Sequence, residues 1–197
     1  ATTLVIYYGA VADVKELAKF DLIVVDNAFK NLRDLKKSIE GKKKTVFGYL
    51  SIGAVKETEP WYPWLVEKKA IGGKNGDFPS YILRLDQLRS DFSIFEEAIT
   101  RCFKDFDGIF LDDLDLCKTN NYADEAKKLI TYIRSKFSKK KLMANRGLEF
   151  LEEFADQIDY TLLESCFAKN GKEIKGGPEW ALGKFTEASN KKNRKLV

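Results

Sequence analysis

Four apolar runs in this 197-residue chain end in a carboxylate, and this pattern constrains the fold more than any other feature. The runs and the acids that follow them are residues 22–25 with Asp26, 81–85 with Asp86, 108–111 with Asp112, and 160–163 with Glu164. Each run has the length and the β-branched or aromatic content of a buried strand. Acids after four such strands indicate one shared edge, as at the carboxyl ends of strands in a parallel α/β barrel.

Strand and helix patterns alternate along the whole chain. Further strands are expected at residues 4–8, 45–50, 141–144 and 196–197, and helices at 14–20, 30–40, 93–103, 123–137, 148–154 and from Pro178. This pattern predicts an α/β fold, a small parallel (β/α)8 barrel of the TIM type whose last βα unit is short or truncated. An open doubly wound sheet is the alternative. Residues 1–197 are expected to form a single domain.

The chain contains no histidine, which removes several catalytic arrangements. No Ser–His or Cys–His pair can form, so proton transfer near neutral pH must come from Asp, Glu, Lys, Tyr or Cys. Strand-end carboxylates are the natural candidates, and paired carboxylates carry out glycoside hydrolysis. We expect neither a metal ion nor another cofactor.

The net charge of +4 comes mainly from lysine, and three basic stretches raise the possibility of a nucleic-acid partner. These stretches are residues 42–44, 139–141 and 191–195. Because each follows a predicted helix and precedes a strand, we interpret them as solvated connections on the face opposite the strand-end acids. No apolar stretch reaches the 18 residues of a membrane-spanning helix. A disulfide between Cys117 and Cys166, which both follow predicted strands, stays open.

The densest concentration of candidate site residues follows the strand at 108–111. Asp112, Asp113 and Asp115 crowd one strand end, where like charges raise at least one carboxyl pKa. One of the three could serve instead as a helix N-cap. Glu164 is a poor cap and a poor strand residue, which favours a functional role.

Other candidates occur at the same predicted strand ends. Asp26 and Asp86 could bind substrate or cap the following helices, and Arg146 could bind a ligand or form a structural ion pair. Asn145 suits hydrogen bonding to sugar hydroxyls. Aromatic residues of the early strands and the third loop could stack on sugar rings; these are Tyr7, Tyr8, Tyr49, Trp61, Tyr62 and Trp64. For Trp61 and Trp64, packing within the loop is an equal alternative.

A glycine- and lysine-rich segment at residues 170–177 suggests a different ligand. Barrel enzymes often bind phosphate through the loops after strands seven and eight. The segment matches no phosphate-loop motif, so we interpret it as a flexible loop at the rim.

Five motifs recur together, in this order, in one known family. They are Tyr7–Gly9, Phe20–Asp26, Gly48–Gly53, Phe106–Asp112 and Asn145–Gly147. With these motifs the chain resembles glycoside hydrolase family 114, the endo-α-1,4-polygalactosaminidase-like barrels that include the spherulin-4 relatives. The resemblance implies a TIM barrel that hydrolyses α-1,4-linked galactosamine polymers, usually outside the cell.

The resemblance also implies site residues, with catalytic carboxylates at Asp112 and Glu164. We expect substrate binding by Tyr8, Asp26, Tyr49, Ser51, Asp86, Asp113, Asp115, Asn145 and Arg146. The chain has Ala54 where many prokaryotic members carry Glu, so a non-catalytic carbohydrate-binding barrel is the alternative, and a phosphosugar enzyme is a third possibility. The expected partner is a polysaccharide or oligosaccharide and not nucleic acid. We expect a monomer with an extracellular or periplasmic location.

Overall fold

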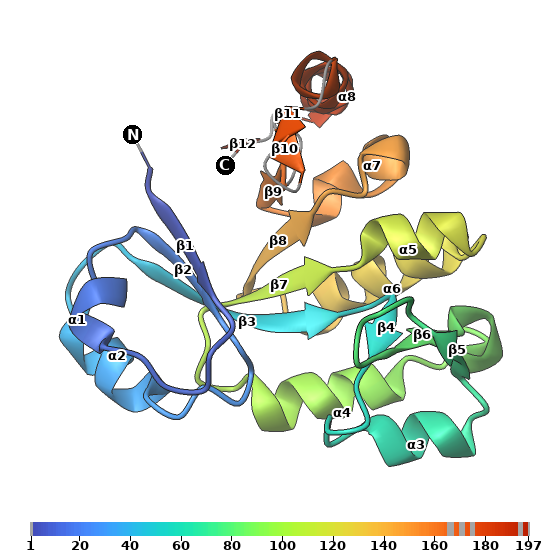
Figure 1. The fold of residues 1–197 in the computed structure, drawn as a ribbon, viewed down its shortest axis with the longest axis horizontal. Coiled ribbons are helices and arrows are strands. Elements are labelled where there is room, and N and C mark those ends of the chain that lie inside the picture. The colour runs from blue at the N-terminus through green and yellow to red at the C-terminus, as the bar shows by residue number, and fades with distance from the viewer. Residues whose placement is uncertain (1, 165–167, 170–171, 174–175, 193–194, 197) are drawn as a thin grey trace.

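The computed structural model describes residues 2–164, 168–169, 172–173, 176–192 and 195–196. Its centre is a curled sheet of parallel strands that are hydrogen-bonded in chain order (Figure 1). The strands are β1 (Leu4–Tyr7), β2 (Leu22–Val25), β3 (Thr45–Ser51), β7 (Gly108–Asp112), β8 (Lys141–Asn145), β9 (Tyr160–Leu162) and β12 (Lys195–Leu196). Within the described residues, β1 and β12 each pair with one neighbour only, so the barrel is open. The predicted barrel class is confirmed, with seven parallel strands.

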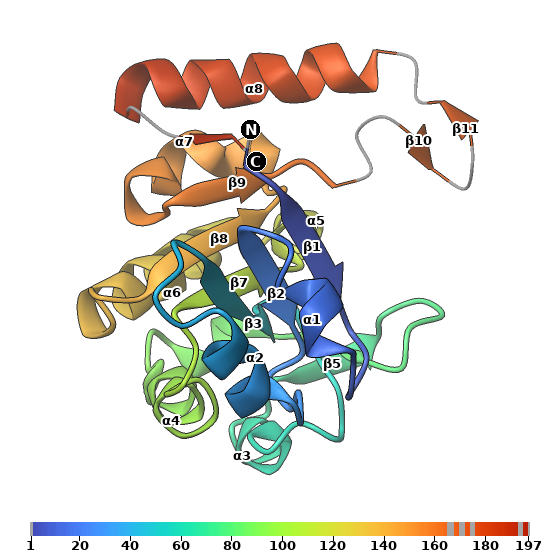
Figure 2. The ribbon, with the colours of Figure 1, turned by 90° about the vertical axis from the view of Figure 1, so that its left-hand side faces the viewer.

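Helices alternate with these strands and cover the outer face of the sheet (Figure 2). They are α1 (Val14–Leu17), α2 (Leu32–Ser38), α3 (Tyr62–Glu67), α4 (Ser93–Cys102), α5 (Leu114–Thr119), α6 (Ala123–Lys136), α7 (Leu151–Phe154) and α8 (Gly177–Lys192), with 3₁₀ turns η1 (Leu85–Leu88), η2 (Leu148–Phe150) and η3 (Ala155–Gln157). Helix α6 illustrates the sequence cause, because Ala126, Ile130 and Ile133 follow helical spacing and are all buried. No helix in the described residues is long and apolar enough to cross a membrane.

The apolar run at 81–85 does not form a barrel strand, and that prediction is wrong. Its first part is β6 (Tyr81–Leu83), which pairs antiparallel with β4 (Ala54–Val55) and β5 (Ile71–Lys74) in a separate three-stranded sheet. This sheet is inserted between β3 and α4. Leu83 and Leu85 are buried on the core in this position, so the apolar run reflects burial and not parallel pairing.

The two faces of the barrel sheet have separate apolar cores. The outer face packs against the helices in one large cluster. The inner face forms a smaller cluster with buried and partly buried members, which are Leu4, Ile6, Leu22, Val24, Phe47, Tyr49, Phe110, Met143, Tyr160 and Leu162. Because both faces are apolar, the strands appear in the sequence as continuous apolar runs.

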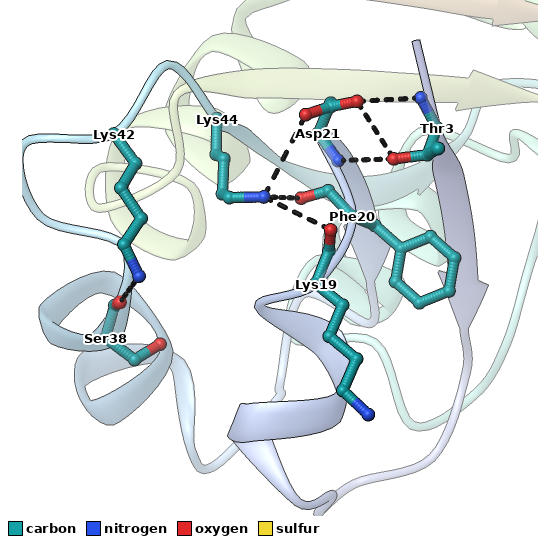
Figure 3. A network of polar contacts seen from close by, with 7 residues as sticks. All are labelled: Thr3, Lys19, Phe20, Asp21, Ser38, Lys42 and Lys44. Carbon is teal, nitrogen blue, oxygen red and sulfur yellow. Dashed lines mark hydrogen bonds and ion pairs between the residues drawn. The ribbon is translucent and has the colours of Figure 1, made fainter. Parts of the chain in front are cut away.

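The lysines at 42–44 lie before β3, at the amino ends of the strands, but the Lys44 side chain is only 15% exposed and is not the solvated residue that was predicted. Figure 3 shows the Lys44 ammonium group donating to the carbonyl oxygens of Lys19 and Phe20 at 3.3 and 2.9 Å. The neighbouring Asp21 carboxylate accepts from the Thr3 backbone and hydroxyl groups at 2.9 Å. These contacts connect the starts of β1, β2 and β3, so Lys44 has a structural role there.

Candidate functional site

The side-chain alternation of the inner face continues into the candidate site. Side chains two residues apart on a strand point to the same face. Each of the barrel strands from β1 to β9 has a last member in the inner-face cluster. The residues two positions after these members are, in strand order, Tyr8, Asp26, Ser51, Asp112, Asn145 and Glu164. Strand geometry therefore delivers polar side chains above the apolar inner core, at the carboxyl end of the barrel.

These residues line one cavity of about 800 Å³. The cavity is lined by ten of the predicted site residues, which are Tyr8, Asp26, Tyr49, Ser51, Asp112, Asp113, Asp115, Asn145, Arg146 and Glu164. Asp86 lies elsewhere, because β6 belongs to the inserted sheet. There its carboxylate accepts from Arg84 at 2.9 Å and from Gln87 at 2.8 Å. The structure thus does not bring Asp86 to the cavity.

Asn145 connects the two carboxylates that the sequence singles out. Its side-chain nitrogen, Nδ2, donates to Asp112 Oδ1 at 2.8 Å and to Glu164 Oε2 at 2.5 Å. The Asn145 side chain is buried, whereas Glu164 is exposed. A shared donor atom keeps these two carboxylate oxygens no farther apart than the sum of the two distances.

The end of β3 supplies a second set of contacts to the same acids. The Tyr49 hydroxyl donates to Asp112 Oδ2 at 2.8 Å, so both oxygens of Asp112 accept a hydrogen bond. The Ser51 hydroxyl donates to Asp113 Oδ2 at 2.5 Å. Gly53 permits this close approach, because a Cβ atom there would lie 2.3 Å from the Asp113 carbonyl oxygen.

Two other predicted ligand-binding acids also have local structural partners. Asp115 forms an ion pair with Arg146 at 2.8 Å and accepts from the Gly147 backbone at 3.0 Å. These contacts hold the turn after β8, where Arg146 has a left-handed φ of 58°. Asp26 accepts from the Ala28 backbone at 2.8 Å. The ion-pair alternative therefore applies to Arg146, which also lines the cavity. Asp26 does not cap the following helix α2, whose N-cap is Asn31.

The electrostatics of the cavity are dominated by closely spaced acids. Burial and the charge of Asp112 raise the pKa of Asp113 from 3.8 to about 6. Burial, followed by the negative charge of Asp112, also raises the pKa of Tyr8 and Tyr49. Tyr49 therefore stays a neutral hydroxyl that can donate to Asp112.

Replacing Asp113 by Asn is expected to stabilise the protein at high pH. The folded protein holds the Asp113 proton up to about pH 6, whereas the unfolded chain releases it near 3.8, so parent stability falls between these values. Asn removes this loss and tolerates the left-handed φ of 62° at position 113. Urea unfolding should show a gain on the order of 1–3 kcal/mol at pH 8.

The same comparison below pH 3.8 should show little or no gain, because both states then hold the proton. Exposed Asp34→Asn, which changes the charge equally outside the cavity, is the control. An equal gain for Asp113→Asn at pH values of about 3.5 and 8 would contradict the electrostatic explanation.

Loop residues that the sequence analysis did not select complete the cavity wall. Glu59 and Phe78 both line it, and burial raises the pKa of Glu59. Neither lies in a periodic segment, so no pattern marked them. Trp61 also lines the cavity, but it is only 3% exposed and packs against Phe103 with ring centres 6.4 Å apart, so both alternatives for that residue stay open.

Some ligand and cysteine predictions fall partly outside the described residues. The suggested phosphate loop at 170–177 is described only at 172–173 and 176–177, and Cys166 is not described. Cys117 is buried, and its thiol lies 3.7 Å from the Ile52 carbonyl oxygen. In the described part of the chain, no three potential side-chain ligands are placed to hold a metal ion.

Comparison with known protein families shows which family of barrels the chain belongs to. The family model of glycoside-hydrolase family GH114 matches residues 2–192. The chain belongs to this family. GH114 membership makes the protein a glycoside hydrolase, as the sequence resemblance predicted, and the ordered motifs of the sequence analysis lie within the matched region. No curated protein matches the chain by sequence.

Solved structures show how widely this fold is shared. The glycoside hydrolase domain of PelA from Pseudomonas aeruginosa has a TM-score of 0.77 and 19% identity, covering 99% of this chain and 82% of that chain. Ega3 from Aspergillus fumigatus, solved in complex with galactosamine, has a TM-score of 0.74 and 11% identity, covering 100% and 75%. Amy13B from Eubacterium rectale has a TM-score of 0.58 and 12% identity, covering 97% and 55%. At these identities the likeness supports the barrel fold.

Proposed function

We propose that this GH114 protein is an endo-acting hydrolase of α-1,4-linked galactosamine-containing polysaccharide, with Asp112 and Glu164 as its catalytic pair. The observation that carries the proposal is the shared hydrogen-bond donor, Asn145 Nδ2, between these carboxylates. A glycosidase needs two carboxyl groups flanking the scissile bond, and this pair lies in a cavity large enough for sugar rings.

The charge of the cavity supports an amino-sugar substrate. Although the whole chain has a net charge of +4, the cavity lining includes two cationic side chains, Lys56 and Arg146, and a larger set of acids. The lining acids are Asp26, Glu59, Asp112, Asp113, Asp115 and Glu164. Arg146 is already paired with Asp115. Such a surface attracts a protonated amine and concentrates a cationic polymer. The likeness to Ega3, which was solved with galactosamine, agrees with this choice.

The hydrogen bonds suggest separate roles for the two carboxylates. Asp112 accepts from Tyr49 and Asn145, which orients its carboxylate for the role of nucleophile. In the first step Asp112 bonds to the anomeric carbon while Glu164 protonates the leaving oxygen. In the second step Glu164 takes a proton from water, which attacks the anomeric carbon and releases Asp112. Asn145 contacts both carboxylates in the resting state.

We expect hydrolysis with retention of anomeric configuration. The two oxygens held by Asn145 Nδ2 at 2.8 and 2.5 Å suit the ~5–5.5 Å carboxyl separation of retaining enzymes better than the ~6.5–9.5 Å of inverting ones. Proton NMR of the first products from an α-1,4-galactosamine oligomer should show the α-anomer before mutarotation. First appearance of the β-anomer would reject the nucleophile role of Asp112.

The same incubation tests the substrate and the mode of cleavage. Reducing ends should increase, and early products should span many lengths because an endo-acting enzyme cuts within chains. Binding without cleavage would favour the non-catalytic barrel, with Ala54, which also lines the cavity, as the first position to change to Glu. Such a polymer substrate also agrees with action outside the cytoplasm, which we include in the proposal.

A further inference from the structure

The exposed aromatic side chain of Phe78 has no structural explanation in the core. Its exposed fraction is 70%, the largest among the exposed large apolar side chains in the part of the chain that the structure describes. Burying a phenylalanine side chain stabilises a fold, and this fold forgoes that gain here. A single exposed apolar residue is common on proteins. The location of Phe78 is what distinguishes it, because it lines the cavity that contains Asp112 and Glu164.

The connection between β5 and β6 holds Phe78 in place. The Asn75 and Ser80 backbones are joined by a hydrogen bond of 3.0 Å, and the Phe78 amide donates to the Asn75 carbonyl oxygen at 3.1 Å. The Ser80 amide donates to the Phe78 carbonyl oxygen at 2.8 Å. The Asn75 side-chain amide donates to the Ser80 hydroxyl oxygen at 3.2 Å. Pro79 further restricts the backbone. The ring is therefore presented by an ordered turn.

This connection projects beside the carboxyl ends of the barrel strands, on the right-hand side of Figure 2. The inserted sheet that carries it is anchored to the barrel through β3, which continues into β4. Phe78 thus belongs to a wall built by the insertion, whereas Asp112 ends β7 and Glu164 follows β9. The two parts of the cavity are contributed by different sheets.

We propose that Phe78 is a stacking platform for a sugar ring bound away from the scissile bond. This inference rests on the proposed function, because an endo-acting enzyme must hold several sugars of one chain. A flat apolar ring packs against the C–H face of a pyranose. It also attracts a nearby protonated amine through a cation–π contact, which suits galactosamine units. Phe78 is thus a specificity-determining residue that favours longer sugar chains and sugars that carry an amino group.

The test measures binding separately from cleavage. In an Asp112→Asn background, Phe78→Ala should weaken binding of a long α-1,4-galactosamine oligomer about 3- to 30-fold by calorimetry. Binding of a disaccharide at the catalytic carboxylates should change less than twofold. Phe78→Trp should restore the long-oligomer affinity. Val66→Ala removes a side chain that is 50% exposed on α3 and does not line the cavity, and it should leave both affinities unchanged.

Cleavage by the parent protein and by the single Phe78→Ala variant is measured in parallel. If the parent cleaves and Phe78→Ala behaves like Val66→Ala on every length, the platform is rejected and the proposed function stands. If the parent binds oligomers without cleaving them, the proposed hydrolase function is rejected. A loss of affinity in Phe78→Ala that grows with oligomer length would still support the platform. If the parent neither binds nor cleaves, both proposals are overturned.

Discussion

Asp112→Asn and Glu164→Gln are each expected to lower kcat on α-1,4-galactosamine polymer by at least ~10². Asn cannot supply the carboxylate that attacks the anomeric carbon, and Gln cannot transfer a proton to the leaving oxygen. Both substitutions nearly preserve volume, so the cavity should keep its shape. Initial rates of reducing-end release, measured with binding affinity for the same polymer, check the prediction.

Polymer binding should persist in both variants, which separates a chemical loss from a folding defect. Asp26→Asn also removes a carboxylate from the cavity wall, but we expect it mainly to raise KM for the cationic polymer. Asp34→Asn, on the exposed surface of α2, should leave both constants unchanged. Parent-like turnover by Asp112→Asn and Glu164→Gln would refute the catalytic assignment.

The barrel could be predicted because its strands carry a clear local pattern. Continuous apolar runs followed by acids mark strands buried on both faces, and β2, β7 and β9 lie where the pattern indicated. The run at 81–85 is similarly apolar apart from Arg84, but it belongs to the antiparallel inserted sheet. Burial alone determines such a run, so its sequence cannot reveal which neighbour it pairs with or in which direction.

The candidate site was predictable where it follows strand geometry and hidden elsewhere. Local patterning does not distinguish Asp112 from Asp113, which only the family resemblance separated, yet in the structure only Asp112 continues the inner-face alternation of Phe110. The double burial of β7 masks the two-residue period that would have separated them. Glu59 and Phe78 reach the cavity from loops, whose paths depend on tertiary contacts and leave no periodic signal.

Asn145→Asp is expected to impair both stability and activity, because it places a third carboxyl group between Asp112 and Glu164. Asn145 is only 5% exposed, and its Nδ2 group donates to both neighbours. An ionised aspartate donates to neither, so three closely spaced carboxylates would repel one another. We expect a loss of ~3–5 kcal/mol in the free energy of unfolding at a pH of about 8 and a fall in kcat of at least ~10².

The pH dependence of this variant distinguishes charge repulsion from a lost contact. The folded protein would raise the pKa of the introduced carboxyl group, so stability should fall as pH rises and recover in acid. Asn145→Ala removes the donor without adding charge, and its smaller loss of ~1–3 kcal/mol should depend less on pH than the loss in Asn145→Asp. In acid, the protonated carboxyl group of the Asn145→Asp variant has one hydrogen-bond donor, whereas the Asn145 amide has two. Activity should therefore recover only in part. Equal stability losses in the two variants at alkaline pH would show that Asn145 does not separate the carboxylates electrostatically.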